Sequence, residues 1–154
     1  MLSPSLRFKV AAVQAAPVAF ELEASIRKLE QFTKTASKAG ADLVVFPEGF
    51  LSAYPWRYAF DATIGARELR GRQWYARYHQ SAVAIPSPEF DHLCSIAREH
   101  DVLLSIGIIE KERDTLYCTA ILLSREGELL YAHRKLIPTV RYQFESRRYE
   151  HIAC

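Results

Sequence analysis

The sequence predicts a mixed β-sheet with helices packed on it, in an α/β or α+β arrangement. Two short apolar runs in the first third of the chain enclose a segment with helical spacing, and further helical segments follow. Three apolar runs joined by short polar links come last, which is typical of a strand meander. The chain has 154 residues, 49% of them hydrophobic, which suffices for one domain with a buried core.

The first third of the chain predicts a strand, a helix and a second strand. Phe8 to Ala16 is apolar, rich in small residues and bounded by Pro17, which favours a buried strand over a helix. From Leu22 onward apolar residues recur every three or four positions, and Gly40 supplies a helix stop. Asp42 to Pro47 is nearly continuous in apolar character, as in a strand covered on both faces of a sheet.

The middle of the chain is less regular. Phe50 to Phe60 is rich in aromatic residues, and its irregular pattern predicts a loop with some helical turns. Residues 66–81 have a helical pattern. Another helix is expected to begin at Ser87-Pro88-Glu89, which offers an N-cap residue, a proline in the first turn and an early acid.

The last part of the chain predicts three strands. They are expected at Val102 to Ile109, Leu116 to Leu123 and Leu129 to Leu136, with polar links over 110–114 and 124–127. Because these links are short, they favour hairpins between neighbouring antiparallel strands.

Composition gives no reason to expect a nucleic-acid or membrane partner. The net charge is only +2, with both signs interspersed, and no apolar stretch approaches the ~18 residues of a membrane span. The first eight residues lack the apolar centre of a secretion signal, so we expect a cytoplasmic protein. Cys94, Cys118 and Cys154 are odd in number and widely spaced, which fits free thiols and suggests neither a disulfide framework nor a zinc site.

Two charged residues are candidate catalytic groups. Glu48 ends the second expected strand, at the edge of a sheet where α/β proteins often build sites, and partial burial there would raise its pKa toward that of a general base. Lys135 lies in the last expected strand, where an ammonium group can stabilise developing negative charge. Taken singly, each residue is more often an exposed side chain at a strand end or sheet edge.

The segments around both residues resemble the nitrilase family of carbon-nitrogen hydrolases. The matching segments, in chain order, are Val10 to Pro17, Leu43 to Phe50, Tyr54-Pro55, Leu116 to Thr119 and His133 to Thr139. The third and fourth of these are more similar to true nitrilases than to the amidase branches. For residues 1–140 the resemblance implies half of a four-layer αββα sandwich, with a mixed sheet flanked by helices.

The resemblance also implies a reaction. In that family a cysteine thiolate attacks the carbon of a nitrile or amide, a glutamate moves protons, and a lysine stabilises the charged tetrahedral intermediate. This would make Glu48 the base and Lys135 the stabilising cation, and a nitrile would become a carboxylic acid and ammonia without a metal or organic cofactor. Tyr54 matches a position that lines the substrate pocket, and simple loop packing is the alternative for it.

The resemblance stops after Thr139. The family continues with a second functional glutamate and a strand that ends in the nucleophilic cysteine, whereas residues 141–154 form a divergent charged tail. Cys154 ends this polar tail and lacks the rigid seat that a nucleophile needs, so we do not expect it to attack a substrate. Cys94 and Cys118 are expected to be packing residues that behave as small hydrophobes.

The chain is therefore expected to be the N-terminal part of a nitrilase-like enzyme, from a truncated or frame-altered gene, and to be inactive by itself. Half of a sandwich leaves apolar faces and sheet edges unpaired, which predicts a homo-oligomer formed through exposed sheet and helix faces. The alternatives are a non-catalytic fragment that acts only by association or ligand binding, and a member of the amidase branch.

Overall fold

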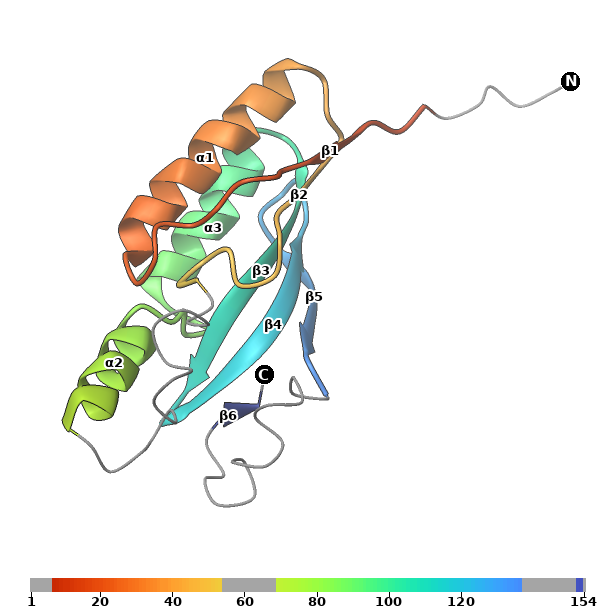
Figure 1. The fold of residues 1–154 in the computed structure, drawn as a ribbon. Coiled ribbons are helices and arrows are strands. Elements are labelled where there is room, and N and C mark those ends of the chain that lie inside the picture. Colours follow the sequence, from red (N-terminus) through yellow and green to blue (C-terminus); the bar gives the residue numbers. More distant parts are fainter. Residues whose placement is uncertain (1–6, 54–68, 137–151, 154) are drawn as a thin grey trace, which may run out of the picture.

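The fold is built on a mixed β-sheet (Figure 1). This computed structural model describes residues 7–53, 69–136 and 152–153. The elements are, in chain order, β1 (Val10–Ala12), α1 (Leu22–Lys38), β2 (Leu43–Val45), α2 (Leu69–Gln80), α3 (Pro88–Glu99), β3 (Leu103–Glu112), β4 (Thr115–Leu123), β5 (Leu129–Arg134) and β6 (Ile152–Ala153). The spatial order of the strands is β1-β2-β3-β4-β5. The first three run parallel, β3, β4 and β5 are antiparallel, and β6 pairs in parallel with the start of β4. The predicted mixed α/β fold is confirmed.

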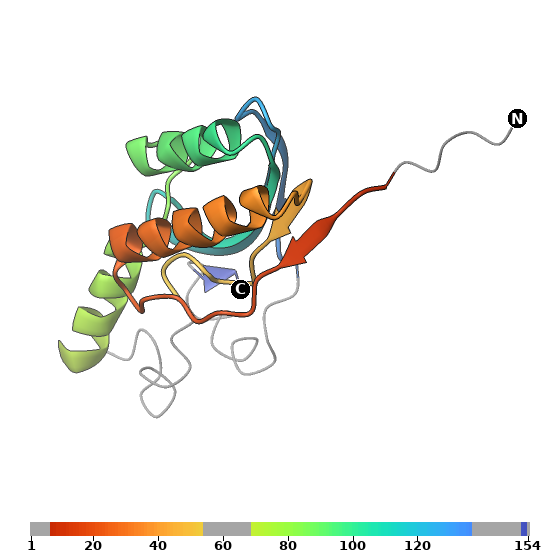
Figure 2. The ribbon, with the colours of Figure 1, turned by 90° about the horizontal axis from the view of Figure 1, so that it is seen from above.

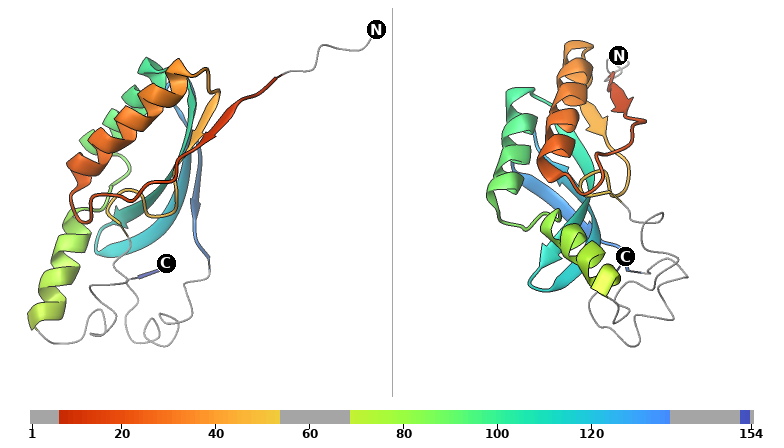
Figure 3. Two further views of the ribbon diagram at one scale, coloured as in Figure 1. Left: turned by 45° about the horizontal axis from the view of Figure 1, so that its top comes forward. Right: turned by 60° about the vertical axis from the view of Figure 1, so that its left-hand side comes forward.

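Helices α1 and α3 cover one face of the sheet, as Figures 2 and 3 show. The apolar residues of α1 that recur at helical spacing, such as Ile26 and Leu29, are buried there in one apolar cluster with Leu93 of α3 and Ile106 and Ile108 of β3. Side chains alternate between the two faces of a strand, so the odd-numbered residues of β3 point away from α1 and α3.

Helix α3 begins where the sequence predicts. The Ser87 hydroxyl oxygen accepts a hydrogen bond from the backbone N–H of Phe90 at 3.2 Å, and Pro88 occupies the first turn. The helix predicted over 66–81 is also confirmed, as α2. It packs through Tyr78 against a second apolar cluster, which contains Ile109 and Cys118.

The strands differ in length from the prediction. β1 is shorter than predicted: among the described residues it pairs with β2 at the end of the strand order, and the hydrogen bond from Val13 N–H to the Val45 carbonyl follows its last residue. β3 is longer than predicted, since residues 110–112 of the expected polar link continue the ladder and leave Arg113 and Asp114 as the turn. The aromatic loop and its Tyr54 lie outside the described residues.

Candidate active site

Glu48 lies on a short loop that interrupts the pairing of β2 with β3. The N–H of Phe46 donates to the Ser105 carbonyl at 2.9 Å, and the chain returns to the sheet where the N–H of Leu51 donates to the Gly107 carbonyl at 3.3 Å. Phe46 and Phe50 are both buried, with ring centroids 4.8 Å apart, and they anchor the loop on either side of Glu48. The loop therefore has fixed ends, although the Glu48 side chain itself is exposed.

Gly107 allows the loop to lie directly on β3. A Cβ atom at this position would be 2.5 Å from the Glu48 Cα and 2.5 Å from the Pro47 carbonyl oxygen, closer than real Cβ contacts. Both obstacles are backbone, so they cannot be relieved by a change of rotamer. Gly49, whose φ is +61°, adds the left-handed conformation that the tight loop requires.

Three side chains meet at the loop. The Lys135 ammonium donates to Glu48 Oε1 at 2.9 Å, and the Cys118 thiol donates to the same oxygen at 3.1 Å. Cys118 and Lys135 are cross-strand neighbours, because the Lys135 N–H donates to the Cys118 carbonyl at 2.8 Å. Thr119 pairs with Ile108, which belongs to the core under α1 and α3, so Thr119 lies on the face that these helices cover. Side chains alternate along a strand, so the neighbouring Cys118, and Lys135 opposite it, point away from that face.

The electrostatics of Glu48 differ from the prediction that burial raises its pKa. Its side chain is 61% exposed, and hydrogen bonds from Lys135 and then from Cys118 hold the pKa of the carboxyl below its usual value. The prediction was wrong because the two donors outweigh the small effect of desolvation. Glu48 is consequently ionised at neutral pH and able to accept a proton.

A second charged group occupies the opposite side of the same strands. The buried Glu110 accepts hydrogen bonds from Arg134 at 2.6 and 3.0 Å and from the Thr119 hydroxyl at 2.7 Å. Arg134 also bonds Glu112 and lies 3.9 Å from the centre of the Tyr117 ring. Burial raises the pKa of Glu110, but the hydrogen bonds from Arg134 and Thr119 outweigh burial and leave that pKa below its usual value. This network joins β3, β4 and β5 next to Lys135.

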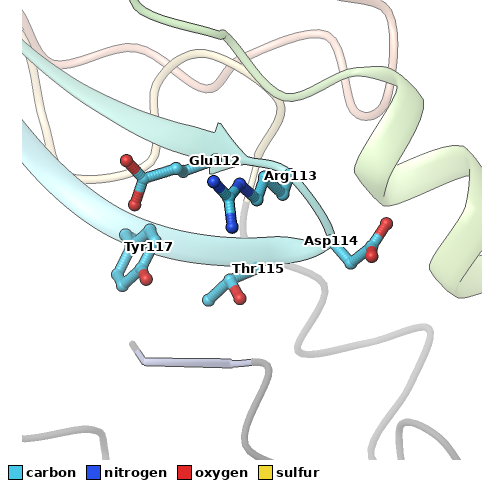
Figure 4. Close-up of a pocket in the computed structure, with 5 residues that line it drawn as sticks. All are labelled: Glu112, Arg113, Asp114, Thr115 and Tyr117. Carbon is cyan, nitrogen blue, oxygen red and sulfur yellow. The ribbon is translucent and has the colours of Figure 1, made fainter.

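An open cleft of about 490 Å³ lies at the turn between β3 and β4. Its lining consists of Glu112, Arg113, Asp114, Thr115 and Tyr117 (Figure 4). Glu112, which lines it, is held by Arg134. The cleft is thus associated with the Glu110 network and does not include Glu48 or Lys135.

The structure brings together the two residues that the sequence singled out as catalytic, Glu48 and Lys135. It adds Cys118, which the sequence predicted as a packing residue only. Its side chain is buried against Ile109 and Leu116, yet its thiol reaches Glu48. Strand alternation places Cys118 on the same face as Lys135, but the partner strand of Lys135 had to be known before that signal could be used. Tyr54 and Cys154 lie outside the described residues.

Among the described residues, no group of three or more histidine, cysteine, aspartate or glutamate side chains is arranged to hold a metal ion. In the same part of the chain, no helix combines the length and the apolar character needed to cross a membrane.

Curated proteins align with most of this chain. Nitrilase 1 from Arabidopsis thaliana is 41% identical over 138 residues, which are 90% of this chain and 40% of that protein. An aliphatic nitrilase from Sinorhizobium fredii (strain HH103) is 44% identical over 133 residues, covering 86% of this chain and 43% of the relative. The chain thus spans about 40% of the length of these curated relatives.

The fold is shared with a solved amidase structure. The amidase from Nesterenkonia sp. AN1, in complex with acrylamide, superposes with a TM-score of 0.63 at 17% identity, over 93% of this chain and 49% of the amidase. The sequence model of the carbon-nitrogen hydrolase family matches residues 9–151, past the boundary predicted at residue 140. That boundary stays a prediction. The family match covers most of the chain, and the fold and the pairing of Glu48 with Lys135 agree with it. The chain therefore belongs to the carbon-nitrogen hydrolase family.

Proposed function

We propose that this chain supplies the proton-transfer and charge-stabilising groups of a nitrilase, which converts a nitrile into a carboxylic acid and ammonia. The observation that carries the proposal is the 2.9 Å contact between Lys135 and Glu48, on the face of the sheet turned away from α1 and α3. An ionised carboxylate accepts a proton from a thiol, and a fixed ammonium stabilises negative charge on nitrogen or oxygen.

The proposed reaction consumes two waters. A cysteine sulfur bonds to the nitrile carbon while the nitrogen gains a proton, which gives a thioimidate. One water adds to the carbon and ammonia leaves, which gives a thioester. A second water releases the carboxylic acid and restores the thiol. Glu48 takes and returns the protons, and Lys135 stabilises the tetrahedral species at each addition.

Neither described cysteine is proposed as the nucleophile. Cys94 lies on α3 and is buried in the apolar core. Cys118 is 4% exposed and donates its thiol proton to Glu48, so a substrate carbon has little access to its sulfur. We propose that the attacking cysteine lies outside the described residues. Cys154 is not favoured as that cysteine, because the segment that precedes it is charged and does not predict an apolar strand.

A nitrile is favoured over an amide as the substrate. The relatives whose names state a nitrilase activity are 41% and 44% identical to this chain, whereas the amidase of the same fold is 17% identical. Tyr54 is proposed to line the substrate pocket. The alternative is that the chain belongs to the amidase branch and that its substrate is an amide.

An ammonia-release assay tests the proposal. The whole chain is incubated with an aliphatic nitrile, an arylacetonitrile and a primary amide, beside Glu48→Gln, Lys135→Met and Cys154→Ala. We expect no release from the chain by itself, because no described cysteine is placed to attack and Cys154 is not favoured; any release from a nitrile should be abolished by both site variants. Glu126→Gln is the matched control, because Glu126 is an exposed glutamate on the turn after β4.

The outcomes separate the candidates. Release that survives Glu48→Gln would contradict the proposed base, and release that disappears in Cys154→Ala would place the nucleophile in the tail. A folded chain that releases no ammonia from any substrate would instead support the non-catalytic alternative.

We further propose that the chain is cytoplasmic and forms homo-oligomers through its exposed sheet and helix faces, with the sheet edges as the first candidates. The two outer strands of the β1-to-β5 order carry exposed apolar residues: Val10 in β1 and Leu129, Leu130 and Tyr131 in β5. Unpaired strand edges of this kind favour association. Sedimentation velocity at micromolar concentration is expected to give a mass above the 17.6 kDa of one chain.

Two lysine substitutions test the route of association. Leu130→Lys is expected to shift the population toward the monomer, because a charge on an edge strand opposes pairing. Leu69→Lys, at an exposed position of α2, is the control. A wild-type chain that sediments as a monomer over the whole concentration range would contradict the proposal, and an effect of Leu69→Lys alone would move the interface to the helices.

A further inference from the structure

The two oxygens of the Glu48 carboxylate have different surroundings. Oε1 accepts the hydrogen bonds from both Lys135 and Cys118. Oε2 accepts none from the residues that the structure describes, and the side chain is 61% exposed. One oxygen is therefore anchored and the other is open on the face turned away from α1 and α3.

Cys118 contacts both catalytic candidates through different groups. Its thiol donates to the Glu48 side chain at 3.1 Å, and its backbone carbonyl accepts from the Lys135 N–H at 2.8 Å. The residue is 4% exposed and packs with Ile109 and Leu116, in the middle of a paired strand. A side chain in such a setting has few alternative rotamers, so its donor direction is fixed.

We propose that Cys118 is a positioning residue for the base: its thiol fixes Oε1 of Glu48 and its carbonyl fixes the backbone of Lys135, which leaves Oε2 as the oxygen that exchanges the proton. The inference rests on the proposed function, because it takes Glu48 as the base. It assigns Cys118 a role in setting the geometry and the pKa of Glu48, and no role in attacking the substrate.

The thiol suits this role because it is a weak donor. A hydroxyl in the same place would make a stronger hydrogen bond to the ionised carboxylate and would lower the pKa of Glu48 further. A valine would fill a similar volume without donating, so the pKa of Glu48 would rise. Substitutions at one position therefore shift the pKa in opposite directions, which a role in packing alone does not predict.

A carboxyl titration tests this. The whole chain is labelled with ¹³C at the glutamate carboxyl groups, and the signal of Glu48 is the one that is missing in Glu48→Gln. Relative to wild type, the midpoint is expected to fall in Cys118→Ser and to rise in Cys118→Val, each by roughly 0.3–1 pH unit. Cys94→Ser is the matched control, a buried cysteine on α3, and it should leave the midpoint unchanged.

The inference is supported if the titration midpoint of Glu48 is lowest in Cys118→Ser, intermediate in the wild type and highest in Cys118→Val. Equal midpoints in the three proteins, or shifts of the same sign in both variants, would overturn it. If Cys118→Val does not fold, Cys118→Ala replaces it, because alanine introduces no atoms that could clash. The titration needs no turnover. The expected order of midpoints without nitrile hydrolysis would keep Cys118 as the anchor of Glu48 and support the non-catalytic alternative, whereas hydrolysis without that order would overturn the inference and leave the proposed function standing.

Discussion

Gly107→Ala is expected to lower the free energy of unfolding by about 2–4 kcal/mol and to separate Glu48 from Lys135. The added methyl group would lie 2.5 Å from the Glu48 Cα and 2.8 Å from the Gly49 nitrogen. Since these are backbone atoms, either the loop lifts from β3 or the strand bends. A lifted loop carries Glu48 away from its two donors, so the pKa of Glu48 is expected to rise.

Urea unfolding measures the loss of stability, and the carboxyl titration measures the change at Glu48. Gly40→Ala is the control, because Gly40 has a φ of +78° but open space around it. Its substitution costs only the strain of the left-handed conformation, on the order of 1 kcal/mol. If Gly107→Ala costs no more than Gly40→Ala and leaves the Glu48 titration unchanged, the loop is not seated on the strand as described.

Gly107 also shows what the sequence could and could not predict. The apolar run around it predicted the strand correctly, because a buried strand requires apolar residues at adjacent positions of the sequence. A glycine inside a strand is a known sign of close backbone approach, but the segment that approaches is Pro47 to Gly49, about sixty positions away in the printed sequence. Periodicity carries no information about such a partner.

The candidate site, too, could be predicted from the sequence only in part. Glu48 and Lys135 were recognised from local motifs, and the structure pairs them. The pKa of Glu48 was predicted in the wrong direction because its position at a strand end implied burial, whereas the deciding donors are Cys118 of β4 and Lys135, the residue after β5. Residues 110–112 were predicted as a surface link because they are charged. The negative charges of Glu110 and Glu112 are neutralised in the strand by Arg134, which belongs to another strand.

Arg134→Met is expected to cost about 2–4 kcal/mol of unfolding free energy, because it leaves Glu110 buried without its cation. Glu110 is 7% exposed, which makes an unpaired carboxylate there costly. Arg134 is 38% exposed, and for that reason the estimate lies below the roughly 3–5 kcal/mol of fully buried pairs. Urea unfolding at pH 7 measures the change, and Arg27→Met in the exposed pair with Glu23 should cost at most about 0.5 kcal/mol.

The pH dependence distinguishes a lost ion pair from simple loss of packing. In the wild type the pKa of Glu110 is lowered, so its contribution to stability is present above the unfolded-state pKa and disappears as the pH falls through the folded-state value. In Arg134→Met burial acts without the cation and raises that pKa, so the variant loses stability as the pH rises. The difference in unfolding free energy between the two proteins should therefore narrow on acidification below about pH 5.

The double variant Glu110→Met with Arg134→Met should recover most of the lost unfolding free energy at pH 7, since no buried charge remains. A gap that is constant with pH, or a double variant as unstable as Arg134→Met, would mean that the arginine acts by packing on Tyr117 instead of by neutralising Glu110.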